Sequence, residues 1–190
     1  YDNLNSGAAL FHQSTLKFGS LALTGGIRLD FERATLDYQH YQILTGNSVQ
    51  KEDVQSSLNF LEFLPMIAMK YSLNERTTPY LTIAKGYNAG GFNSTFEREE
   101  DRSFQPEQSI NYETGLKARF FDSRLFANIA LFYISWKNQQ IYQPVPSGQG
   151  SMLKNAGKSE SKGLELDVKY IPFENFEIWG TLGYNDARFV

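Results

Sequence analysis

Two histidines and one run of carboxylates are the side chains with the most evident capacity for chemistry. His12 and His40 lie far apart, and neither has a cysteine or a carboxylate pair at the spacing of a metal site. The run Glu99-Glu100-Asp101 has an arginine on each side, which is typical of a solvated loop tip. No nucleophile-elbow pattern is present. The sequence therefore predicts no catalytic residue, no metal ligand and no cofactor, and we expect a protein that is not an enzyme.

A glycine-rich segment at residues 85–93 is the second candidate. It contains Gly86, Gly90 and Gly91 but no Gly-Lys-Ser/Thr sequence and no following helix, so it does not match a phosphate-binding loop. Glycine within a strand more often marks a bulge or a close approach of two backbones, and we expect one of these here. If the strands surround a pore, a kink at these glycines would direct Phe92 and the next loop toward its mouth.

Composition restricts the class of protein. The 190 residues are 41% hydrophobic and 15% aromatic, with a net charge of −3 and no cysteine. Without cysteine there are no disulfides and no thiolate metal sites. No apolar run reaches the roughly 18 residues that a transmembrane helix needs. A transmembrane β-strand alternates instead, and the mean hydropathy of −0.42 is compatible with that pattern. The charge balance and the lack of a basic patch indicate no nucleic-acid partner.

Alternating apolar and polar residues predict long β-strands. The segment 111–120 shows this most clearly, because Tyr112, Leu116 and their neighbours of the same parity are apolar while the other parity is charged. The expected strands cover residues 8–17, 21–41, 57–73, 80–92, 111–120, 125–142, 153–170 and 176–188. Within the third strand, Pro65 cannot donate a hydrogen bond to the ladder, which predicts a bulge or a strand start there.

The connections between these strands alternate in length. Short turns lie near residues 19, 75, 122 and 173, and long polar loops are expected at 42–56, 93–106 and 143–152. Short turns at one end and long loops at the other are typical of outer-membrane barrels, whereas a β-sandwich does not require them. The predicted fold is all-β: an antiparallel meander of about eight long strands, part of a transmembrane β-barrel. A soluble sheet with one wet face is the alternative.

In such a barrel the charged face must line the lumen, because a lysine or arginine facing lipid near the midplane costs ~2–4 kcal/mol. The residues expected to face lipid are Leu21, Leu23, Ile27, Leu29, Tyr112, Leu116, Ala118, Leu164, Leu166, Val168, Tyr170, Ile178, Leu182 and Tyr184. The residues expected in the lumen, paired by charge across neighbouring strands, are Arg28, Asp30, Glu32, Glu113, Lys117, Arg119, Glu165, Asp167 and Lys169.

Four stretches, in this order, resemble the TonB-dependent outer-membrane receptors. Residues 85–93 are similar to a glycine-rich strand end of that family, and 104–117 to its "PE…YE.G.K" strand. Residues 130–141 are similar to the strand that follows, and 155–166 to the "N.G…..G.E" strand. The resemblance implies a bacterial outer-membrane barrel of about 22 strands with a plug domain inside. It also implies uptake of ferric siderophores, haem, cobalamin or glycans, with energy from TonB. Since the plug and most strands are missing, we expect residues 1–190 to be a segment of the barrel domain.

The predicted function is therefore the barrel portion of an outer-membrane active-transport receptor for a scarce nutrient such as a ferric siderophore. Its expected partners are outer-membrane lipid, TonB through the absent plug, and that small ligand. Because loops on a rigid scaffold carry function, the candidate ligand-binding residues are those at loop bases and tips: Tyr87, Phe92, Arg98, Arg102 and Tyr142. Two alternatives stay open: a complete small eight-stranded barrel with a structural or adhesive role, and an outer-membrane hydrolase.

Overall fold

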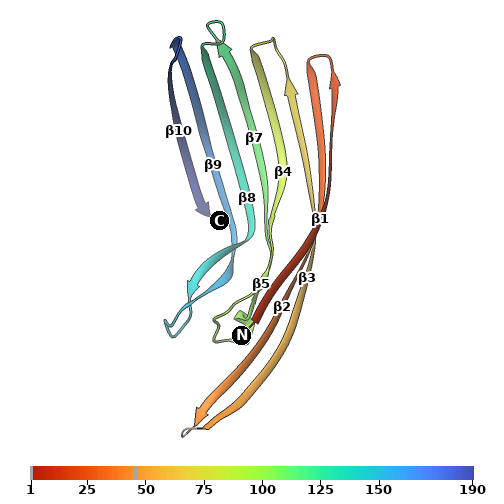
Figure 1. The fold of residues 1–190 in the computed structure, drawn as a ribbon, viewed down its shortest axis with the longest axis vertical. Helices are drawn as coiled ribbons and strands as arrows, with labels where there is room; N and C mark the ends of the chain where they lie inside the picture. Colours follow the sequence, from red (N-terminus) through yellow and green to blue (C-terminus); the bar gives the residue numbers. More distant parts are fainter. Residues whose placement is uncertain (1, 45–46) are drawn as a thin grey trace.

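The structure is a computed structural model that describes residues 2–44 and 47–190, and the side chains of residues 40–52 lie outside that description. Eight strands form one antiparallel sheet in the order β1-β2-β3-β4-β7-β8-β9-β10 (Figure 1). Their bounds are β1 Asp2–Phe18, β2 Leu21–Leu44, β3 Asn47–Tyr71, β4 Thr77–Asn88, β7 Glu107–Phe120, β8 Leu125–Pro144, β9 Ser151–Phe173 and β10 Phe176–Phe189. The predicted all-β meander of eight long strands is confirmed.

The connection between β4 and β7 contains the remaining elements. Strands β5 (Gly91–Phe92) and β6 (Ser103–Phe104) form a separate two-stranded sheet, with the 3-10 helix η1 (Glu99–Asp101) between them. The short turns gather at one end of the sheet, which we call the turn end (Figure 1). The β2–β3 and β8–β9 hairpins reach the opposite end, the loop end, where the β4–β7 connection lies between them. β1 and β10 do not pair with each other in the described chain, so the sheet is open.

Several expected boundaries are wrong, among them the start of the first strand, since β1 begins at Asp2 and not at residue 8. Residues 42–56 are not a loop in the described chain, because β2 continues to Leu44 and β3 begins at Asn47, with Leu44 opposite Asn47. Polarity indicates exposure to water, and a hairpin that projects into water can remain extended with polar side chains. The loop at 143–152 is shorter than expected, since β8 ends at Pro144 and β9 begins at Ser151. The strand at 80–92 is divided, because β4 ends at Asn88.

Pro65 lies next to the end of the β3–β4 ladder and not at a bulge or a strand start. β3 passes through Pro65 opposite Ile27 without a register shift, so the predicted bulge or strand start is wrong. Instead, β3 pairs with β4 only from Met66 to Lys70. Proline has no N–H and cannot extend that ladder, and the two strands diverge beyond it (Figure 1).

The two faces of the sheet are those that the alternation predicts. The register puts Leu29 opposite Phe63, and Tyr112 opposite both Ile83 and Tyr133, so the residues expected to face lipid share one face. The charged residues lie on the other, which we call the inner face. Lys117, for example, lies opposite Asn128, and Arg119 opposite Phe126. Contact of the apolar face with lipid stays a prediction.

The expected charge pairing across neighbouring strands is confirmed for Lys169 of β9, which pairs with Glu177 of β10. Among the other eight inner-face charges named above, the one ion pair between described side chains joins Arg28 to Asp30, which belong to the same strand (Nη2–Oδ1 2.8 Å). Across strands, the Lys85 Nζ lies 2.8 Å from a Glu62 carboxylate oxygen. Within the described side chains, Lys117 and Arg119 have no carboxylate within the 4.0 Å that defines an ion pair.

Candidate functional site

Residues 89–106, which we call the inner loop, fold onto the inner face at the loop end. Phe92 is only 6% exposed and packs in a cluster with Ala34 and Leu36 of β2. Gly90 explains how the loop comes so near the sheet. A Cβ at that position would lie 2.8 Å from the Phe60 ring and 3.0 Å from the Pro106 nitrogen. The close backbone approach predicted for this glycine-rich segment is confirmed.

Asn93 joins the inner loop to β9. Its Nδ2 donates to the Asp101 carbonyl (2.8 Å) and to the Leu153 carbonyl (2.9 Å), while its Oδ1 accepts from the Leu153 N–H (2.7 Å). The side-chain amide of Asn93 therefore makes the two hydrogen bonds that the backbone of a neighbouring strand would make to Leu153. Since Asn93 is 5% exposed, these bonds form away from water, where an unmade hydrogen bond is costly.

The β8–β9 hairpin holds the other end of the inner loop. The Asn155 Oδ1 accepts from the Gln105 N–H, and its Nδ2 donates to the Gln105 carbonyl, both at 2.8 Å. Gln140 donates to the Ala89 carbonyl at 2.7 Å. Lys154 forms an ion pair with the buried Asp101 (2.9 Å). The loop thus packs against β2 through apolar side chains and against β8–β9 through polar ones.

The structure separates the five predicted ligand residues into three places. Phe92, Arg98 and Arg102 belong to the inner loop, where Phe92 forms part of its packing. Arg98 is exposed and lies 3.4 Å from Glu100, and Arg102 pairs with Glu99. Each arginine therefore has a carboxylate neighbour, which reduces the positive charge available to an anionic ligand.

The other two lie apart from the loop tip. The Tyr87 hydroxyl is buried near the end of β4, with no hydrogen-bond partner in the described part of the chain. Tyr142 is 76% exposed on the outer part of β8. The ligand role of all five residues stays a prediction. In the described residues no group of three or more His, Cys, Asp or Glu side chains could hold a metal ion.

Sequence reasoning missed the polar residues that fix the inner loop: Asn93, Asp101, Gln140, Lys154 and Asn155. Asn93 and Asn155 lie within the stretches that resemble receptor motifs, which is the one signal that points to them. Their partners are distant in sequence, since Asn93 and Leu153 are 60 positions apart.

The described residues contain no helix long and apolar enough to cross a membrane.

An antiparallel meander with one apolar and one charged face, short turns at one end and long hairpins at the other, defines the wall of an outer-membrane β-barrel. A family model described as "TonB dependent receptor-like, beta-barrel" matches residues 1–190. The chain belongs to this family, whose members are β-barrel proteins of the bacterial outer membrane.

The similar proteins are receptors and transporters. The chain is 33% identical to the pesticin receptor of Yersinia enterocolitica over 77% of its own length and 20% of that receptor. It is 24% identical to the metal-pseudopaline receptor CntO of Pseudomonas aeruginosa, over 86% of its own length and 21% of the relative. It therefore spans about one fifth of the curated relatives it matches.

Solved structures share the fold. The ferric yersiniabactin uptake receptor FyuA of Yersinia pestis superposes with a TM-score of 0.75 at 24% identity, over 98% of this chain and 28% of that one. The copper transporter OprC gives a TM-score of 0.78 at 17% identity, over 98% and 30%. Since its relatives are transport receptors rather than enzymes, the predictions of the family, the outer membrane and a non-enzymatic role are confirmed.

Proposed function

We propose that residues 1–190 form part of the wall and outer hairpins of a receptor that takes up a ferric siderophore or a similar metal chelate with energy from TonB. The match of the family model to the whole chain carries this proposal. The names of the relatives support the substrate class, because they include metal-pseudopaline and ferripyoverdine receptors. Under this proposal the plug domain and the remaining strands belong to other parts of the polypeptide.

The loop end is where this segment would meet the ligand. The inner loop forms a platform whose ends are held by Asn93 and Asn155, so its tip does not need to be ordered by the ligand. Arg98 at that tip and Tyr142 on β8 are exposed there. Arg98 on the fixed platform offers a cationic group, part of whose charge Glu100 offsets, and Tyr142 on the separate β8–β9 hairpin offers an aromatic face; both suit a small anionic chelate.

Uptake by the full-length receptor tests the function. A strain that lacks its other iron receptors, and that carries this one, is supplied with a panel of radiolabelled ferric siderophores under iron limitation. We expect accumulation of one ferric chelate, and its loss when TonB is deleted. An assembled receptor that accumulates no metal chelate would refute the substrate class. Accumulation that persists without TonB would refute the energy source.

A further inference from the structure

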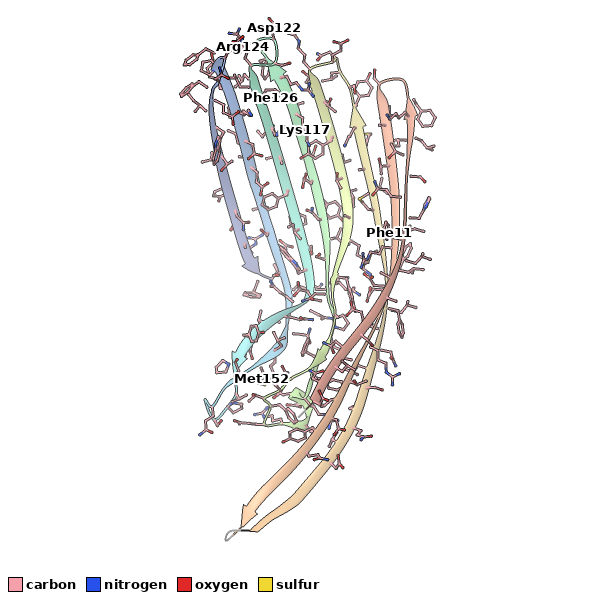
Figure 2. The ribbon with its side chains drawn as sticks, in the orientation of Figure 1. Phe11, Lys117, Asp122, Arg124, Phe126 and Met152 are labelled. Atoms are coloured by element: carbon pink, nitrogen blue, oxygen red, sulfur yellow. The ribbon has the colours of Figure 1, made fainter. Side chains whose placement is uncertain are left out.

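A patch of cations lies on the apolar face of the sheet, the one opposite the inner face, which we call the outer face. Tyr133 of β8 belongs to the outer face, because the register puts it opposite Tyr112. Side chains of a strand alternate between the two faces, so Lys137, four residues along β8, also lies on the outer face. The chain runs from Arg124 at the turn end along β8 toward the loop end, where Met152 begins the return along β9 (Figure 2). Lys137 is therefore nearer the loop end than Tyr133.

The patch, which we call the outer cation patch, occupies three successive rows of the outer face across β8, β9 and β10. From the turn end to the loop end these rows contain Lys162 and Asp186, then Glu160 and Arg188, then Lys137 and Lys158. The row before them, on the turn-end side, contains Leu131, Leu164 and Tyr184. The outer face therefore changes from apolar to charged at the outer cation patch.

Tyrosines mark the same boundary. Tyr112 and Tyr133 lie in the first of the three rows, with their ring centres 6.1 Å apart. Aromatic side chains form girdles where the apolar band of an outer-membrane barrel meets the lipid headgroups. Lys137 lies about 13 Å beyond Tyr133 along the strand, or about 10 Å in height at a strand tilt of about 40°. Since the headgroup layer is about 5–8 Å thick and a lysine side chain can extend back toward it, the ammonium groups reach the headgroups.

The carboxylates of the outer cation patch do not neutralise it. The Lys162 Nζ lies 3.7 Å from an Asp186 oxygen, and the Arg188 Nη2 lies 3.7 Å from a Glu160 oxygen. Charge-assisted hydrogen bonds are about 2.7–2.9 Å long, so both pairs are loose, and their partial exposure weakens them further. Two carboxylates thus face four cations, and the patch has a net positive charge.

Lys137 and Lys158 are directly opposite each other on neighbouring strands. Both are exposed, and among the described side chains neither has a carboxylate within the 4.0 Å of an ion pair. Like charges directly opposite destabilise a pair of strands. The regular pairing is interrupted at the next positions, Asn138 and Gly157, which have φ values of 54° and 26°. An anion that bridges the two ammonium groups would offset their repulsion.

We infer that the outer cation patch binds the phosphate groups of a lipid in the outer leaflet of the outer membrane, with Lys137 and Lys158 as the principal contacts. The inference goes beyond the proposed function and rests on one part of it, the outward orientation of the loop end. Long hairpins of outer-membrane barrels are extracellular, which puts the patch at the level of the outer leaflet. Phosphates are the anions at that level, lysine binds phosphate as a point charge, and basic side chains at a membrane surface attract anionic headgroups.

Photocrosslinking of the full-length receptor to a defined lipid tests this inference. The receptor is delipidated in a neutral detergent, and a benzophenone amino acid replaces Ser135, an uncharged residue of the outer face opposite Glu160. Diphosphoryl lipid A is then added in increasing amounts. We expect a saturable crosslink, with an apparent affinity about tenfold weaker in the Lys137→Gln/Lys158→Gln variant, which corresponds to about 1.4 kcal/mol. Lipid A without its phosphates, which keeps the same acyl chains, should bind parent and variant equally weakly.

Lys117→Gln/Arg119→Gln is the matched control, because it removes two cations from the inner face of β7, and Lys117 lies near the turn end (Figure 2). Its affinity for diphosphoryl lipid A should equal that of the parent. Lys137→Arg/Lys158→Arg keeps both charges and should also keep the affinity. The heat-modifiable gel migration of every variant shows that its barrel has assembled.

Four results would overturn the inference. They are no saturable crosslink to diphosphoryl lipid A, an unchanged affinity in the Lys137→Gln/Lys158→Gln variant, an equal loss in the inner-face control, and equal binding of lipid A without phosphates. Displacement of the lipid by millimolar inorganic phosphate would also overturn it, because the site would then bind free phosphate and not a lipid headgroup.

The crosslink needs neither a transported ligand nor TonB, so the two proposals fail separately. A receptor that accumulates a ferric chelate but gives no lipid crosslink refutes only the lipid site. A receptor that gives the crosslink but accumulates no chelate refutes only the substrate class.

Discussion

Gly115→Ala should destabilise the sheet although the change adds a single methyl group. Gly115 lies on the inner face opposite Tyr80, and the Tyr80 ring covers it. An added Cβ would lie 2.6 Å and 2.7 Å from two ring carbons, and it would also contact the Ile129 carbonyl oxygen. The ring cannot move freely, because its hydroxyl donates to Glu113 at 2.7 Å.

The magnitude follows from these contacts. Overpacking costs about 1–3 kcal/mol, and a hydrogen bond to a charged group is worth about 1.5–3 kcal/mol. Alanine regains about 0.5–1 kcal/mol of backbone entropy relative to glycine. If the ring is displaced and its hydrogen bond is lost, the free energy of unfolding should fall by about 2–5 kcal/mol.

Denaturant unfolding of the full-length receptor in detergent micelles, followed by fluorescence, measures this loss. Gly25→Ala is the matched control, since Gly25 lies in β2 with a paired strand on each side and an added Cβ would meet nothing within 4 Å. In a Tyr80→Ala background, Gly115→Ala should lose the part of its cost that comes from the ring. Equal effects of Gly115→Ala and Gly25→Ala would refute the reasoning.

Three further predictions concern ion pairs and hydrogen bonds of the inner face and the inner loop. Lys85→Met should lower the unfolding free energy by about 1–3 kcal/mol, because it leaves the half-buried Glu62 carboxylate with Gln108 as its remaining donor. Arg98→Gln, which removes an exposed ion pair, should change the unfolding free energy by less than about 1 kcal/mol. Equal losses in the same denaturant titration would contradict the role of burial. Asn93→Leu should speed deuterium exchange at the Leu153 amide and protease cleavage within residues 94–102, with Ser94→Ala as the unaffected control; unchanged exchange would show that the amide does not hold the loop. Arg98→Gln combined with Arg102→Gln should weaken uptake of an anionic ferric chelate in the radiolabel assay, and unchanged uptake would remove both from the ligand site.

Local patterns in the sequence determine the parts of this fold that could be predicted. The two faces follow from period-two alternation, so the separation of Tyr112 from Glu113 needs no knowledge of distant residues. Polarity alone does not distinguish a water-exposed hairpin from a loop, which is why the loop predicted at residues 42–56 is wrong. The fixed position of the inner loop was not predictable from local pattern, because it depends on Asn93 meeting Leu153 and on Phe92 meeting Ala34.

The short ladder between β3 and β4 has a mechanical consequence. Only five residue pairs join these strands, from Met66–Ala84 to Lys70–Tyr80, whereas β3 pairs with β2 along its whole length. The wall therefore consists of two stiff plates, β1–β3 and β4–β10, connected by a narrow strip near the turn end. A sideways load on the loop end would bend the wall along this line before it disrupted either plate. The ties across the gap would carry the strain: the Lys85–Glu62 bridge, the hydrogen bond from Gln108 to Glu62, and the packing of the inner loop on β2.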